Sequence, residues 1–117
     1  MAEGVTYDLE CRTTEFGEAV IEFLGNVRET AITRPLISQV VRSATSVGAN
    51  YGEADDAVSK KDFRLRIAYC RREARETKFW LRMLVKADPS LSDTAKPLWQ
   101  EAKELHLIFS KIWRSAG

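Results

Sequence analysis

The sequence is poor in the residues that bind metals and carry out nucleophilic catalysis. It has one histidine, His106, and two cysteines, Cys11 and Cys70, in 117 residues. A di-metal helical bundle needs two Glu-x-x-His motifs, but Lys103 stands three residues before His106. Neither zinc-ligand spacing nor a disulfide framework is present, nor a glycine-rich phosphate loop or a Cys-His or Ser-His signature. We therefore expect no enzyme activity, no metal site, no cofactor, and two reduced thiols.

The sequence also lacks an excess of charge and a long apolar run. Eighteen basic and seventeen acidic residues give a formal net charge of +1, so overall charge does not attract the chain to nucleic acid or to an anionic membrane. No apolar stretch approaches the roughly 20 residues that cross a bilayer. The first residues show no signal-peptide pattern. We expect a cytoplasmic protein without membrane association.

The sequence does contain helical periodicity. Apolar residues recur every three or four positions within residues 16–27, 36–54, 63–84 and 98–112. Thr33 and Ser59 are expected to cap the second and third helices, and Pro89 to end the third. No strand-like alternation is present. The pattern predicts an all-α fold, an antiparallel up-and-down four-helix bundle, as one domain of residues 1–117 with residues 1–13 as an N-terminal arm.

A polar stripe accompanies the apolar one on the second predicted helix. It consists of Arg42, Ser43, Ser46, Asn50 and Glu53, at intervals of three and four. If this helix and the third form a hairpin that turns near residues 57–59, residues whose numbers sum to about 116 lie level. Arg42 then comes abreast of Glu73 and Glu76, which share an edge of the third helix with Trp80.

Two interpretations of these polar residues remain open. Arg42 and the glutamates satisfy one another in a network within or between subunits, or the stripe lines a polar pocket for a ligand. Because the third helix has a second face that is not purely solvent-directed, we also expect a homo-oligomer. Gly48, inside the second helix, favours close helix packing over a phosphate site, since it is not at a helix start.

The third predicted helix carries a line of basic residues, which we call the basic stripe: Lys60, Arg64, Arg71, Arg75, Lys78, Arg82 and Lys86. A phosphate backbone of RNA or DNA fits along such a line. Alternatively, the stripe is a solvated face whose members pair with Glu29, Glu101 or Glu104. Nearby rings are few, Phe79 and Tyr69 being the candidates, so a base-stacking platform is not indicated.

A combined pattern spans residues 39–84. Its members are Gln39, Arg42, Ser43, Ser46 to Tyr51, Glu53, Ala54, Glu73, Glu76, Trp80 and Leu81, while Gly52 stands where a charged residue is expected. In these positions the chain resembles the 23S rRNA intervening-sequence proteins of bacteria. The resemblance implies a four-helix bundle that assembles into a ring, commonly a homopentamer, without established enzymatic activity. A similar bundle is the accessory variability protein of diversity-generating retroelements, which binds a reverse transcriptase and nucleic acid.

Two functions follow as hypotheses. In the first, the protein is a nucleic-acid accessory protein that holds RNA or DNA along the basic stripe without base specificity. In the second, it is an oligomeric scaffold that recruits a protein partner, such as a polymerase, through the apolar patches around Trp99, Leu107, Ile108 and Trp113. A metabolic enzyme has only the arginine and glutamate cluster in its favour.

Overall fold

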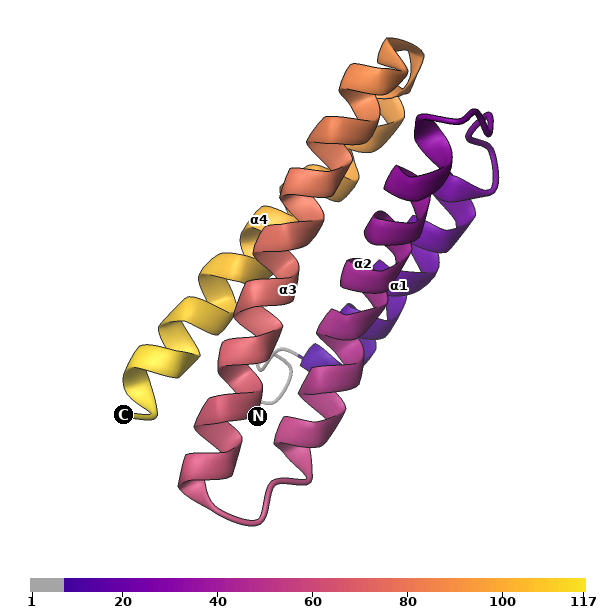
Figure 1. Cartoon of the computed structure of the whole chain (residues 1–117). Helices are drawn as coiled ribbons and strands as arrows, with labels where there is room; N and C mark the ends of the chain where they lie inside the picture. The colour runs from indigo at the N-terminus through magenta and orange to yellow at the C-terminus, as the bar shows by residue number, and fades with distance from the viewer. Residues whose placement is uncertain (1–7) are drawn as a thin grey trace.

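The computed structural model describes residues 8–117, which form four long helices and one short 3₁₀ turn (Figure 1). The helices are α1 (Leu9–Leu24), α2 (Thr33–Asp55), α3 (Lys60–Ala87) and α4 (Ser92–Ser115), and the turn η2 (Pro89–Leu91) joins the last two. The α1–α2 and α3–α4 connections lie at one end of the molecule and the α2–α3 connection at the other (Figure 1). The predicted all-α four-helix bundle is confirmed.

The helices follow one another around the bundle. Each packs extensively against the next one along the chain, while α4 and α1 contact each other more sparsely and close the bundle. None of the helices in residues 8–117 is long and apolar enough to cross a membrane.

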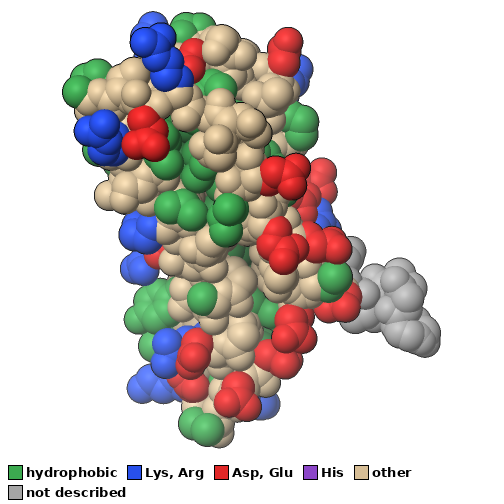
Figure 2. All heavy atoms as spheres, turned by 90° about the vertical axis from the view of Figure 1, so that its right-hand side faces the viewer, with side chains coloured by type: hydrophobic (Ala, Val, Ile, Leu, Met, Phe, Trp, Pro, Cys, Tyr) green, Lys and Arg blue, Asp and Glu red, His purple; other side chains and the backbone are tan. Residues whose placement is uncertain are grey.

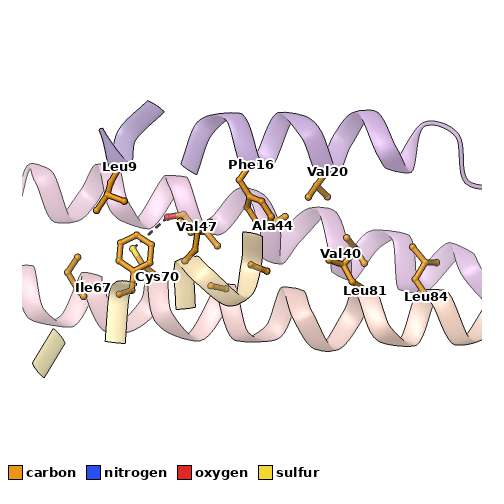
Figure 3. Close-up of a cluster of buried hydrophobic side chains, with 14 of the residues drawn as sticks. Leu9, Phe16, Val20, Val40, Ala44, Val47, Ile67, Cys70, Leu81 and Leu84 are labelled. Carbon is orange, nitrogen blue, oxygen red and sulfur yellow. Dashed lines mark hydrogen bonds between the residues drawn. The ribbon is translucent and has the colours of Figure 1, made fainter. Parts of the chain in front are cut away.

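The core lies where the apolar stripes of the four helices meet. Its fully buried members include Val20 of α1, Val47 of α2, Ile67 and Leu81 of α3, and Phe109 of α4. Figure 3 shows residues of α1, α2 and α3 pointing toward one another between the ribbons. Burying each of the large side chains contributes about 1.5–3 kcal/mol, so this core is the main source of stability.

The start of α1 corrects the predicted N-terminal arm. Asp8 caps the helix, because its Oδ1 accepts a hydrogen bond from the backbone nitrogen of Cys11 at 3.0 Å. Leu9 and Thr13 are buried. Residues 9–13, predicted to be part of the arm, are therefore the first turn of α1, and residues 1–7 lie outside the described residues.

The starts of α2 and α3 depend on hydroxyl caps. Thr30 Oγ1 accepts from the nitrogen of Thr33 at 3.0 Å, and Thr33 Oγ1 accepts from the nitrogen of Thr30 at 2.8 Å. Thr33 is thus already helical and is one half of a reciprocal cap, rather than the single cap that was predicted. At α3, Ser59 Oγ accepts from the nitrogen of Asp62 at 3.0 Å, and the predicted cap is confirmed.

Gly48 lies where α1 and α2 approach each other. A Cβ atom at this position would lie 3.3 Å from Oγ1 of Thr13 and 3.4 Å from its carbonyl oxygen. That spacing leaves little room for a side chain, so the close-packing interpretation of Gly48 agrees with the structure.

Candidate functional site

Arg42 joins α2 to α3 through two carboxylates. Its Nη1 donates to Oε1 of Glu73 at 3.2 Å and its Nη2 to Oε1 of Glu76 at 2.9 Å, while Nε donates to the side-chain oxygen of Gln39 at 3.1 Å. Glu73 is 5% exposed and also accepts from Nη2 of Arg72 at 3.3 Å. We call these five residues the Arg42 cluster. The hairpin spacing placed its three central charges at the correct level.

Charges in the Arg42 cluster are balanced. Partial burial lowers the pKa of Arg42, but hydrogen bonds to Glu76 and Glu73 and the attraction of their charges outweigh it, so the pKa is raised above its ordinary value. The buried carboxylate of Glu73 faces two guanidinium groups, one on each side. Because its charges already satisfy one another, this cluster is suited to holding α2 against α3 rather than to binding a ligand.

Behind the Arg42 cluster, a buried pair of hydroxyl groups continues into the core. Oγ of Ser43 lies 3.0 Å from Oγ1 of Thr77, and both residues are fully buried. Each hydroxyl also donates to a backbone carbonyl of its own helix, Ser43 to Gln39 at 2.9 Å and Thr77 to Glu73 at 2.7 Å. Thr77 was not predicted, because the same hairpin count places Glu73, one helical turn earlier, level with Ser43.

Other members of the predicted polar stripe stay outside the cluster. Ser46 donates to the carbonyl of Arg42 at 2.7 Å, and Asn50 to that of Ser46 at 2.9 Å, so both bond within α2. Glu53 is exposed. Trp80 is half-buried and meets the ring of Phe79 edge-on, at a centroid distance of 4.9 Å. The structure therefore brings together only part of the predicted set.

The basic stripe follows one side of α3, which holds ten of the eighteen basic residues of the chain. No member of the stripe forms an ion pair with a carboxylate within residues 8–117. The expected partners are engaged elsewhere. Glu101 and Glu104 bind Arg12 of α1, at 2.7 and 3.3 Å, and Glu29 binds Arg34 at 3.5 Å.

The pair between Arg12 and Glu101 ties α1 to α4. The guanidinium donates to both carboxylate oxygens of Glu101, through Nε at 2.7 Å and Nη2 at 2.9 Å. The hydrogen bond to Glu101, offset in part by burial, raises the pKa of Arg12 above its ordinary value. This bidentate pair removes Glu101 from the reach of the basic stripe.

Trp113 of α4 packs against two arginines of the basic stripe. Its ring centroid lies 3.9 Å from Cζ of Arg64 and 4.4 Å from Cζ of Arg71. Nε of Arg64 also donates to the carbonyl oxygen of Trp113 at 3.1 Å. These contacts, each worth about 0.5–1 kcal/mol at an exposed site, orient the arginines without neutralising them.

A second tryptophan repeats this arrangement further along the seam between α3 and α4. Trp99 lies 5.8 Å from Nζ of Lys78 in α3 and equally far from Nζ of Lys103 in α4. It also borders a largely apolar groove of about 470 Å³, whose rim includes Arg82 and Lys96. The prediction of few rings near the stripe is therefore wrong, because α4 supplies two.

These contacts also change the apolar patch predicted on α4. Trp99 and Trp113 are half-buried against basic side chains, and Ile108 packs on the core. Leu107 is 56% exposed. The patch is thus reduced to one large exposed side chain among its four members.

Between Trp113 and Trp99, an open groove of about 540 Å³ runs between α3 and α4. Its lining is Ala68, Tyr69, Arg71, Arg72, Arg75, His106 and Ser110, without a carboxylate. Burial and the positive charges of Lys78, Arg71 and Arg75 lower the pKa of His106 below its ordinary value. We call this the cationic groove. Its chemistry suits an oxyanion such as phosphate.

The other side of the molecule has the opposite charge. α1 packs on α2 and α4, diagonally across the bundle from α3, and carries four acidic residues, Glu10, Glu15, Glu18 and Glu22, against the single basic residue Arg12. Figure 2 looks at the side of the bundle that α1 and α2 form and shows acidic side chains spread over it. The net charge of +1 therefore conceals an uneven distribution, with a net acidic α1 and ten of the eighteen basic residues on α3.

In sequence, residues 10–111 match the family described as 23S rRNA-intervening sequence protein. The chain belongs to this family. A member of the S23 ribosomal protein family from Bacteroides thetaiotaomicron, of unknown function, has a crystal structure that is similar to the intervening-sequence protein described here. It shows a TM-score of 0.77 at 26% identity, over 89% of this chain and 96% of that one. No curated protein matches the sequence.

Proposed function

We propose that this intervening-sequence protein is a non-enzymatic accessory protein that holds nucleic acid along the seam between α3 and α4. The observation that carries the proposal is the contrast in pairing. Among residues 8–117, Glu73, Glu76, Glu101 and Glu104 are each bound by an arginine outside the basic stripe, whereas no member of the stripe forms an ion pair. Phosphates supply the negative charge that the protein itself does not.

The seam offers more than charge. The cationic groove lies beside Trp113, and the apolar groove lies beside Trp99. A strand that placed phosphates in the first would bring bases toward the second, where the lining is largely apolar and includes the half-buried ring of Trp99. Both features tolerate any base, which supports binding without sequence preference.

The test is a charge-neutralised variant, Arg71→Gln with Arg75→Gln and Arg82→Gln. We expect it to lose at least tenfold in affinity for a fluorescent 20-nucleotide single strand at low salt, measured by anisotropy. The slope of log affinity against log salt should fall by about 0.7 for each phosphate contact removed. The matched control is Arg28→Gln with Arg34→Gln and Lys111→Gln, which removes the same charge from exposed positions off the seam. If both variants lost the same affinity, the loss would follow from the change in net charge alone, and the proposed site would be refuted.

We also propose that the protein assembles into a ring, as a homopentamer, through the free edge of α3. Phe79 is 52% exposed, and Arg72, Arg75, Glu76, Phe79 and Trp80 line an open groove of about 460 Å³ beside the Arg42 cluster. A second copy would cover this apolar side chain. The number of subunits is the one that the family resemblance implies.

Light scattering coupled to size exclusion measures the mass directly. We expect five subunits for the wild type and a lower mass for Phe79→Asp. The control is Ile32→Asp, a change at a side chain that is 65% exposed in the α1–α2 connection. A monomeric wild type would contradict the ring. A pentamer that binds no nucleic acid would instead favour the scaffold hypothesis, in which a protein partner such as a polymerase occupies the surface.

A further inference from the structure

The cationic groove contains the single histidine of the chain. His106 and Ser110 lie one turn apart on α4, and Arg71 and Arg75 lie one turn apart on α3 across the groove. Both helices thus direct two polar residues into the same space. A group bound there would meet side chains from both walls.

Positive charge surrounds His106. Burial of the imidazole, together with the charges of Lys78, Arg71 and Arg75 from α3, keeps its pKa below the usual value of 6.5. Of the remaining groove residues, Tyr69 is a phenol, and Arg72 is already bonded to Glu73. On α4 itself, Lys103 stands one turn before His106.

Among residues 8–117, Arg71, Arg75 and Lys78 form no ion pair with a carboxylate. The lining of the cationic groove has no carboxylate, and the nearby glutamates of α4, Glu101 and Glu104, are bound to Arg12. The imidazole is therefore mostly neutral near pH 7, because burial and the neighbouring positive charges both disfavour its protonated form. The neutral imidazole adds no further positive charge to the groove.

We propose that the cationic groove is a phosphate subsite, in which the imidazole of His106 takes up a proton from solvent when a phosphodiester of a nucleic acid binds between it and Arg71 and Arg75. The subsite rests on the proposed function for the origin of its ligand. Protonation converts the free ring nitrogen from an acceptor into a second donor, so the imidazolium adds a charge-assisted hydrogen bond to the two guanidinium groups.

The proton uptake fixes the sign of the pH dependence. A bound phosphodiester stabilises the imidazolium, so the pKa of His106 is higher in the complex than in the free protein. Affinity then increases as pH falls from the bound pKa to the free pKa and is constant outside that window. A phosphodiester itself does not titrate there, so the dependence belongs to His106.

Because the chain has one histidine, its imidazole carbon–proton signal in NMR spectra reports this site alone. The pKa is measured between pH 5 and 8 in three samples of the full chain: protein alone, protein with sodium sulfate, and protein with an oligothymidylate of four nucleotides without terminal phosphate. Ionic strength is matched with sodium chloride. We expect a pKa below 6.5 for the protein alone. Both ligands should raise it by at least about 0.5, with roughly threefold tighter binding of the oligonucleotide at low pH.

Two variants separate the subsite from its surroundings. His106→Gln should abolish the pH dependence of oligonucleotide binding while retaining most of the affinity measured at pH 8. Arg75→Gln should raise the pKa of His106 in the protein without ligand. It should also reduce the change in that pKa that sulfate produces. Arg28→Gln, at an exposed position in the α1–α2 connection and outside the basic stripe, is the control and should change neither the pKa of His106 nor its shift with sulfate.

The outcomes distinguish the subsite from the proposed function. An oligonucleotide that binds without moving the pKa of His106 would overturn the subsite and leave nucleic-acid binding intact. A shift with sulfate but no binding of the oligonucleotide or of the 20-nucleotide strand would refute the proposed function and overturn the assignment to a nucleic acid, leaving a site for a free oxyanion. No shift with either ligand would overturn the subsite entirely.

Discussion

The two sides of α3 both carry arginines, but they differ in what faces those arginines. In the Arg42 cluster, Arg42 and Arg72 meet the carboxylates of Glu73 and Glu76 within 3.3 Å. In the cationic groove, Arg71 packs on Trp113, and Arg71 and Arg75 line the same space as His106 and Ser110 without an ion pair to a carboxylate of residues 8–117. One helix thus has a face whose arginines are paired with carboxylates and another face whose arginines are not.

This contrast shows that the arginine content of a surface does not by itself indicate binding. An arginine whose partner is built into the fold contributes to rigidity, since a ligand would have to displace a carboxylate held nearby. An arginine held by a ring face keeps its charge and its donors available. The distinction lies in the neighbouring helix: α2 contacts one side of α3 through Arg42, and α4 contacts the other through aromatic rings.

The largest expected effect on the free energy of unfolding comes from removing the buried carboxylate of Glu73 in the Arg42 cluster. Glu73→Ala leaves Arg42 and Arg72 without the acceptor between them, and charge-assisted hydrogen bonds of this kind contribute about 1.5–3 kcal/mol. We expect a loss of about 2 kcal/mol in the free energy of unfolding, measured by urea titration at fixed protein concentration. Glu76→Ala, at a side chain 41% exposed, should cost below about 0.5 kcal/mol. Equal costs would mean that burial of Glu73 has no role.

A smaller effect is expected at the hydroxyl pair behind the Arg42 cluster. Thr77→Val keeps the shape of the side chain but removes a buried hydroxyl that contacts Ser43, at a cost of about 1 kcal/mol. In the Thr77→Val background, Ser43→Ala should lower the free energy of unfolding by less than it does in the wild type, because the partner hydroxyl is already absent. Strict additivity in this double-mutant cycle would show that the two hydroxyls do not interact.

The smallest effect should come from the cationic groove, as a pH dependence of stability. The pKa of His106 is lowered in the folded state, so the unfolded chain binds more protons between that value and 6.5. The contribution of His106 to stability therefore increases as pH rises through this window and is lost below it. In His106→Asn, the change in urea midpoint between pH 5 and 8 should be smaller than in the wild type. An unchanged dependence would indicate that other groups titrate instead.

Much of the fold could be predicted from periodicity, because a buried stripe at every third or fourth position is specific for a helix in a bundle. The contact of Arg42 with Glu73 and Glu76 could also be predicted, since an antiparallel hairpin with a short turn fixes which residues lie level. The start of α1 could not. Its cap, Asp8, precedes a turn with a single strongly apolar residue, Leu9, so the pattern becomes clear only at Phe16.

The seam between α3 and α4 was predicted only in part, although the necessary signal was present. Counting about η2 places residues whose numbers sum to about 180 at the same level, which brings Trp113 between Arg64 and Arg71 and Trp99 near Lys78. The pairing of Glu101 with Arg12 had no such signal, because α1 and α4 are not consecutive and no turn sets their register. Long-range contacts between non-adjacent helices depend on the closure of the whole bundle.

The two cysteines differ in exposure, so their reactions with a thiol reagent report separately on the folded bundle and on its opening. Cys11 is exposed, whereas Cys70 is fully buried in α3, with its Sγ 3.6 Å from the carbonyl of Val47 and its pKa raised by burial to about 12 (Figure 3). A thiol reagent reaches the first while the helices remain together. It reaches the second only when the helices around Cys70 separate, so the incorporation of a second label reports this opening, and its rate equals the opening rate when modification is faster than reclosing.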